Sequence, residues 1–263
     1  MVESGSTINS SFAFNINSGQ KTYNLYAAIT SKSFNPSSTT FSPPPLKITL
    51  RSITGVSTTG GVTGAIQLVE YPPSSNTLAT NATKTGSSAT AVWTYDLTLS
   101  PIGYTIPPGT YTYTVTVQYS DGATSINRTF NITISVQSVV SLAFTQNSTP
   151  NFDFSSASAY SNGITMSNAN TFTLKSNKNW IFTAAANTAN FSNSGTYSTT
   201  MPASVLRLTV GSTQGNLSTS ALQLNSGSAT SGTTFNMSLF ANPGYNYGPG
   251  IYTINISYTI TAQ

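Results

Sequence analysis

The sequence of 263 residues contains no cysteine and no histidine, and only 5% of its residues are charged. Ordinary soluble proteins carry about 25% charged residues, so this chain takes its polarity from Ser, Thr and Asn instead. Without cysteine there is no disulfide framework and no thiolate chemistry. Without histidine the commonest general base and the common zinc ligands are missing. We therefore predict that the protein is not an enzyme, uses no cofactor and holds no metal ion.

The acidic residues do not form a catalytic or calcium-binding pattern. The five acids, isolated from one another in the sequence, are Glu3, Glu70, Asp96, Asp121 and Asp153. A glycosidase needs two carboxylates about 5–9.5 Å apart, and a calcium loop gathers several acids. Asp121 precedes Gly122, a dipeptide typical of hairpin turns. No two acids share a loop, so we expect neither kind of site.

The basic residues are equally dispersed. Nine Lys and Arg give a formal net charge of +4, but they form no run or stripe. Nucleic-acid-binding surfaces cluster such residues on one face, and a membrane helix needs about 20 consecutive apolar residues. The sequence has neither feature. We predict that the protein binds no nucleic acid and has no membrane span.

The residues that are abundant favour strands. The chain has 14 Tyr and 13 Phe, is 38% hydrophobic, and is rich in Val, Ile and Thr, while the surface-helix formers Glu, Lys and Arg are scarce. Its length suits two domains of common size. We predict an all-β fold with two tandem immunoglobulin-like β-sandwich domains, residues 1–137 and 138–263.

An internal duplication supports this division. In residues 109–119 and again in residues 250–260, apolar side chains alternate with small polar ones, the period-2 pattern of a strand. Further segments match between the two halves: residues 25–34 with 182–191, residues 46–50 with 206–210, and Leu97 and Leu99 with Met237 and Leu239. We therefore predict that each copy forms a sandwich of about seven short strands.

The two copies differ at their ends. After Tyr119 come a turn at residues 120–123 and a second alternating run, with Phe130, Ile132, Ile134 and Val136 on one face, whereas three residues follow Ile260. The second copy thus lacks a closing strand, and such an edge beside an open apolar groove invites a strand from another chain. We predict that the groove is lined by Tyr252, Ile254, Ile256, Tyr258 and Ile260.

Other aromatic residues have two interpretations. Trp93 and Trp180 lie in or beside predicted strands, where we expect them to fill the cores. Tyr104, Tyr245 and Tyr247 lie in Pro/Gly-rich loops before the repeated strand. Exposed loop aromatics can stack on sugars or hydrophobic surfaces, or they can form a corner between strands.

The polar composition of residues 72–88 predicts a long loop.

Two segments resemble known families. Residues 249–258, Pro-Gly-Ile-Tyr-Thr-Ile-Asn-Ile-Ser-Tyr, resemble the penultimate strand of pilins from archaic chaperone–usher pathways and of spore-coat-U-like proteins. Residues 176–182, followed by 201–206, resemble immunoglobulin-like surface domains of Bacteroidetes-type bacteria. The first resemblance implies donor-strand complementation, in which a periplasmic chaperone and then another pilus subunit donates the missing strand. It also implies an exported cell-surface protein; residues 1–6 are not a signal peptide, so we expect the export signal to have been removed.

Two functions remain open at this point. Phe12, Phe14 and Ile16 match Phe172 and Leu174, which leaves residues 1–11 as a polar overhang instead of a donor strand. A subunit with an acceptor groove and no donor resembles a two-domain tip adhesin or minor pilin, whose first domain would bind a glycan or an abiotic surface. The alternative is a self-complete tandem module, carbohydrate-binding or a spacer, in which residues 142–154 close the second sandwich.

Overall fold

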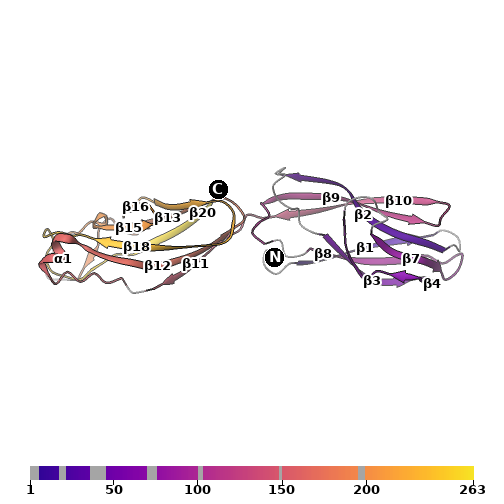
Figure 1. Ribbon diagram of the computed structural model, residues 1–263, viewed down its shortest axis with the longest axis horizontal. Coiled ribbons are helices and arrows are strands. Elements are labelled where there is room, and N and C mark those ends of the chain that lie inside the picture. The colour runs from indigo at the N-terminus through magenta and orange to yellow at the C-terminus, as the bar shows by residue number, and fades with distance from the viewer. Residues whose placement is uncertain are drawn as a thin grey trace. The chain divides into compact units, whose positions relative to one another are not determined.

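The computed structural model describes residues 6–17, 22–35, 46–69, 76–99, 103–147, 150–194 and 199–263. The chain divides into two compact units, residues 1–137 (unit 1) and residues 138–263 (unit 2). Each unit consists of antiparallel sheets packed around its own hydrophobic core (Figure 1). The predicted all-β sandwich class is confirmed.

Unit 1 has two main sheets. Its strands are β1 (Ser6–Ile16), β2 (Thr22–Asn35), β3 (Leu46–Thr54), β4 (Val56–Thr58), β5 (Gly61–Val62), β6 (Ala65–Gln67), β7 (Thr77–Lys84), β8 (Ala91–Leu99), β9 (Gly109–Ser120) and β10 (Ser125–Val136). One sheet has the order β1-β8-β3-β6, and the other has the order β10-β9-β2-β7-β4, with β5 also on β7. Side chains alternate across each strand, so one face of each sheet contributes to a common core.

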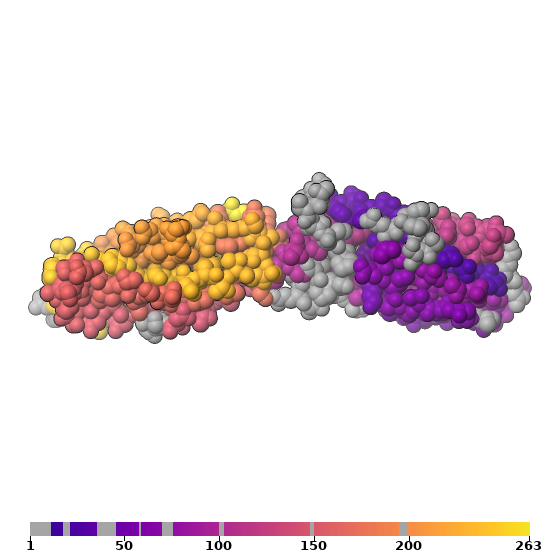
Figure 2. Space-filling model, viewed as in Figure 1, coloured from indigo at the N-terminus to yellow at the C-terminus, as the bar shows by residue number. Residues whose placement is uncertain are grey.

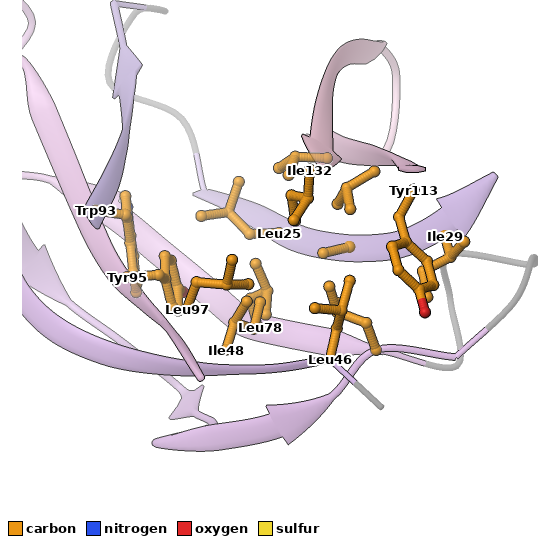
Figure 3. Close-up of a cluster of buried hydrophobic side chains, with 14 of the residues drawn as sticks. Leu25, Ile29, Leu46, Ile48, Leu78, Trp93, Tyr95, Leu97, Tyr113 and Ile132 are labelled. Carbon is orange, nitrogen blue, oxygen red and sulfur yellow. The ribbon is translucent and has the colours of Figure 1, made fainter. Parts of the chain in front are cut away.

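The core of unit 1 receives side chains from both sheets. In Figure 3, Ile132 of β10 and Leu25 of β2 lie above Ile48 and Leu97 of the opposite sheet. Trp93 is completely buried, as predicted, and its Nε1 donates a hydrogen bond to the Tyr23 hydroxyl at 3.0 Å. Strand β10 is therefore part of the core that holds this sandwich together.

Unit 2 repeats the plan without an equivalent of β10 among its described residues. Its elements are β11 (Val140–Gln146), α1 (Ala157–Asn162), β12 (Ile164–Ser176), β13 (Trp180–Ala186), β14 (Ser192–Asn193), the 3-10 helix η2 (Ala203–Val205), β15 (Leu206–Val210), β16 (Thr213–Asn216), β17 (Leu222–Gly227), β18 (Thr230–Ala241), β19 (Tyr252–Thr253) and β20 (Ile256–Ala262). The sheet orders are β11-β12-β18-β15-β16, β17-β13-β20 and the short pair β14-β19. Trp180 is 3% exposed, which confirms its predicted core position, and its Nε1 donates to the Ser228 carbonyl at 2.9 Å.

The two units share a strand register. Leu25 of β2 faces Tyr119 of β9, and at the matching positions Phe182 of β13 faces Ile260 of β20. Both repeated segments also carry a tyrosine whose hydroxyl binds a backbone carbonyl four residues earlier: Tyr111 donates to Pro107 at 2.6 Å and Tyr252 to Gly248 at 2.7 Å. This arrangement is like the tyrosine corner of immunoglobulin-type sandwiches.

One predicted match is wrong by two residues. Ile48 faces Leu97 in unit 1, and its counterpart Leu208 faces Leu239 in unit 2. Leu97 therefore corresponds to Leu239, not to Met237. A shift of two residues leaves every side chain on the same face of a strand, so an alternating pattern alone cannot detect it.

Several predicted boundaries are also wrong. Residues 250–260 are not one strand: β19 pairs with β14 and β20 pairs with β13, because the partner strand is itself interrupted after Ala186. The predicted loop at residues 72–88 contains β7, whose buried positions include small alanines that give a weak apolar pattern. Residues 6–11 are not an overhang, since they belong to β1, which pairs with β8. The rest of the predicted overhang, residues 1–5, lies outside the described residues.

Candidate functional site at the edge of β20

Strand β20 lies at the end of its sheet. Every residue from Ile256 to Ala262 pairs with β13, and among the described residues no other strand pairs with β20. The alternating sequence directs Ile256, Tyr258 and Ile260 toward the core, yet all three are only partly buried. An edge strand presents unpaired N–H and C=O groups, which are a template for pairing with another strand.

The matching strand of unit 1 has a different environment. β9 lies between β10 and β2, and its inward residues are buried: Tyr111, Tyr113, Val115, Val117 and Tyr119 have exposures of 8% or less. The closing strand β10 follows through a turn in which the Asp121 carboxylate accepts hydrogen bonds from two backbone N–H groups, those of Ala123 and Thr124. This hairpin and the inward face of β10 confirm the sequence prediction for unit 1. The described part of unit 2 has no equivalent of β10.

Strand β11 forms the facing wall of the open side. It pairs with β12, so it extends the opposite sheet and does not pair with β20. Phe144 points toward the interior, with its ring centroid 5.2 Å from that of Phe172 and 5.9 Å from that of Tyr258. Nevertheless, 48% of Phe144 is exposed. On the face shown in Figure 2, the yellow C-terminal residues of unit 2 lie beside the red residues near its beginning.

The floor of this open side contains a polar pair. Asn170 of β12 is 3% exposed, and its Nδ2 donates to the Tyr258 hydroxyl at 3.4 Å. Burial raises the pKa of Tyr258 to about 12, and the hydrogen bond from Asn170 partly opposes that rise. The Asn170 Oδ1 is buried and has no hydrogen-bond partner among the described residues. Sequence reasoning missed Asn170, because a single Asn in a chain rich in Asn carries no signal.

The five predicted groove residues are not in one strand. Ile256, Tyr258 and Ile260 belong to β20, Tyr252 belongs to β19, and Ile254 lies between the two strands. All five are partly buried. The Tyr252 hydroxyl lies 2.8 Å from the Thr199 hydroxyl and also donates to Gly248. Tyr252 is thus held by its own loop, while Ile256, Tyr258 and Ile260 lie on the edge strand β20.

The three loop aromatics have unlike environments. Tyr104 is only 8% exposed, so it is not the exposed aromatic that a ligand-facing role requires. Tyr247 is partly buried. Tyr245 is 67% exposed, but one face of its ring stacks on Tyr160 at 5.4 Å, and its hydroxyl donates to the Ala157 carbonyl at 2.8 Å. Tyr245 is the one of the three that presents a free ring face.

The described residues contain no arrangement suited to catalysis or metal binding. Asp96 forms an ion pair with Arg51 at 2.6 Å, and Asp121 caps its turn, while Glu3 and Glu70 lie outside the described ranges. Within those ranges no three His, Cys, Asp or Glu side chains lie together as a metal site requires. No helix in the described part of the chain has the length and apolar character needed to cross a membrane.

No protein-family model and no curated protein matches the sequence. Among solved structures, the chain is similar to a chaperone–tip adhesin complex of CFA/I fimbriae biogenesis, at 12% identity and a TM-score of 0.36, over 97% of this chain and 91% of that one. It is similar to the CsuC–CsuE chaperone–tip adhesion subunit complex from archaic chaperone–usher Csu pili of Acinetobacter baumannii, at 10% identity and a TM-score of 0.34, over 89% and 92%. It is also similar to the CupB6 tip adhesin from Pseudomonas aeruginosa, at 8% identity and a TM-score of 0.36, over 97% and 88%.

Proposed function

We propose that this protein is a non-catalytic, extracellular fibre subunit in which a strand from another polypeptide completes unit 2. The donated strand would lie between β20 and β11, running antiparallel to β20 as β10 runs to β9. The observation that carries the proposal is the difference between the matched strands. Strand β9 has two partners and buried inward residues, whereas β20 has one described partner and partly exposed inward residues.

The energetics favour occupation of this edge. A fully buried Ile, Val or Phe side chain contributes roughly 1.5–3 kcal/mol relative to an exposed one. The inward residues of β10 that reach full burial in unit 1 are Ile132, Ile134 and Val136, at 6–8% exposure. In the register of β10 on β9, a strand of the same kind would place Ile132, Ile134 and Val136 opposite Ile254, Tyr252 and Gly250, and Phe130 opposite Ile256. It would bury these apolar side chains along the predicted groove and pair the edge N–H and C=O groups of β20.

The roles of the two units follow from this arrangement. Unit 2 would dock onto a periplasmic chaperone during export and onto another pilus subunit in the fibre. Unit 1, whose β10 already closes its sandwich, would be the unit that presents a binding surface, to a glycan or an abiotic surface, as in a two-domain tip adhesin. In the alternative, a self-complete tandem module, residues 142–154 close the second sandwich, and Leu142, Phe152 and Phe154 do pack against the core of unit 2. Strand β11 of this segment pairs with β12 and not with β20, so β20 has no second strand partner among the described residues, which favours the first proposal.

A peptide test addresses the proposal with the full chain. The peptide has the sequence of residues 125–136, whose partners in unit 1, residues 109–120, correspond to residues 250–261, and hydrogen exchange is measured at residues 256–261. We expect the peptide to protect β20 amides and to raise the melting temperature of unit 2. A matched peptide with Thr at the positions of Ile132 and Ile134 should do neither, because it retains strand propensity without the apolar side chains. Unchanged exchange in β20 with both peptides would reject the proposal.

A further inference from the structure

The position of Asn170 has an aromatic counterpart in unit 1. Strands β3 and β15 fix the correspondence: Tyr95 lies between Leu50 and Phe12, and Met237 lies between Val210 and Asn170. Asn170 therefore occupies in unit 2 the place that Phe12 occupies in unit 1. At this position the two units have the same strand register, but the side chain that faces the open edge is aromatic in unit 1 (Phe12) and an amide in unit 2 (Asn170).

In unit 1 this position contacts the closing strand. The ring centroid of Phe12 lies 4.9 Å from that of Phe130, an inward residue of β10. Phe130 faces Val115, whose counterpart in β20 is Ile256. A strand received at β20 would therefore place its residue opposite Ile256 against Asn170.

The Asn170 side chain needs a polar neighbour there. A buried amide requires a partner for its acceptor as well as for its donors, and an unmatched buried atom is costly. The Asn170 Nδ2 donates to Tyr258, while the buried Oδ1 has no partner among the described residues. A phenyl ring in the place of Phe130 would leave that oxygen unmatched.

The available space points to a short side chain. Phe144 packs on Phe172 and reaches to 5.9 Å from the ring of Tyr258, so it already occupies part of the space between β11 and β20. Unit 1 has no counterpart of β11 among its described strands. A short hydroxyl-bearing side chain satisfies both conditions, because Ser and Thr can donate to Oδ1 and need little room.

We infer that the strand received by unit 2 carries Ser or Thr at the position equivalent to Phe130, followed by apolar residues at the positions equivalent to Ile132 and Ile134. This inference rests on the proposed function. It makes Asn170 the residue that selects the partner strand, by rejecting a strand with a uniformly apolar inward face. Specificity of this kind arises because a mismatched partner leaves a buried polar atom unpaired.

The test compares two peptides on the full chain. Both have the sequence of residues 128–136, and one carries Ser in place of Phe130. We expect the Ser peptide to bind about tenfold more tightly in calorimetry or fluorescence anisotropy. In the Asn170→Ala variant this preference should disappear. In the control variant Thr173→Ala, which changes a residue on the same strand that does not face the core, it should remain.

The outcomes separate the two proposals. Binding of both peptides with equal affinity, or tighter binding of the Phe130 peptide, would overturn the Asn170 inference and leave the acceptor edge intact. Failure of both peptides to bind would overturn the proposed function and the inference with it. Should Asn170→Ala not fold, Phe144→Ala provides a second variant. In this variant the ratio of the two peptides' affinities should fall at least threefold, because the removed ring makes room for Phe. An unchanged affinity ratio would refute the steric part of the inference.

Discussion

Extension of the chain by its own closing strand tests the open edge most directly. The variant carries a short Gly/Ser linker after Gln263 and then a copy of residues 125–136, so that β20 and the copy can form the hairpin that β9 and β10 form. Ser125 pairs with Ser120 at the start of that hairpin, and Val136 pairs with Gly109 at its far end. The copy should therefore settle antiparallel to β20, with the copies of Ile132 and Ile134 opposite Ile254 and Tyr252 and with its apolar face toward the core of unit 2.

The expected magnitude comes from a matched control. In the control extension, Thr replaces the copies of Ile132 and Ile134, which are 8% and 6% exposed in unit 1. Each buried Ile contributes roughly 1.5–3 kcal/mol, so the two extensions should differ by about 3–6 kcal/mol in the free energy of unfolding of unit 2. At about 4 °C per kcal/mol for a domain of this size, that difference corresponds to about 12–24 °C in melting temperature.

Differential scanning calorimetry of the full chain measures this difference. The transition of unit 1 provides an internal reference, because β10 already closes that sandwich. If the native-sequence extension and the Thr control melt at the same temperature, the open side of unit 2 does not receive an apolar strand in this register and the reasoning is refuted. A rise of equal size in both extensions would also refute it, since such a rise would come from the linker or from strand pairing alone.

Two further predictions concern buried tyrosines. Tyr23→Phe leaves the Nε1 of Trp93 without its 3.0 Å acceptor, so unit 1 should lose about 1–3 kcal/mol; urea unfolding of this variant beside Tyr26→Phe measures the loss, and equal stabilities would contradict it. Burial raises the pKa of Tyr258 to about 12 from 10.0, so the folded state holds the phenol proton more strongly than the unfolded state does. The contribution of Tyr258 to the free energy of unfolding of unit 2 is therefore complete below pH 10 and is lost as the pH rises toward 12. Tyr258→Phe should therefore make the alkaline loss of stability of unit 2 shallower over that interval, and an identical loss in both proteins would show that Tyr258 does not contribute.

The local sequence determined the features that depend on periodicity. Alternation predicted β9 and β10 and the turn between them, because a strand with one buried face must place apolar residues at every second position. The size and aromatic character of Trp93 and Trp180 placed them in the cores, since such side chains bury the largest apolar area. The repeat between the halves matched residues 25–34 with 182–191 and residues 109–119 with 250–260, and the structure pairs both sets in the same register.

Only the tertiary structure decided which strands are neighbours. The apolar pattern of residues 140–146 is compatible with either sheet, and pairing with β12 placed Phe144 beside Tyr258 and left the edge of β20 open. Strand β7 has only two alanines and one leucine as buried apolar residues and forms because β2 supplies a partner, which a polar sequence does not reveal. Asn170 became part of the open side through the packing of β12 against β20. Non-local pairing depends on segments far apart in the chain, so a pattern read along one segment could not determine it.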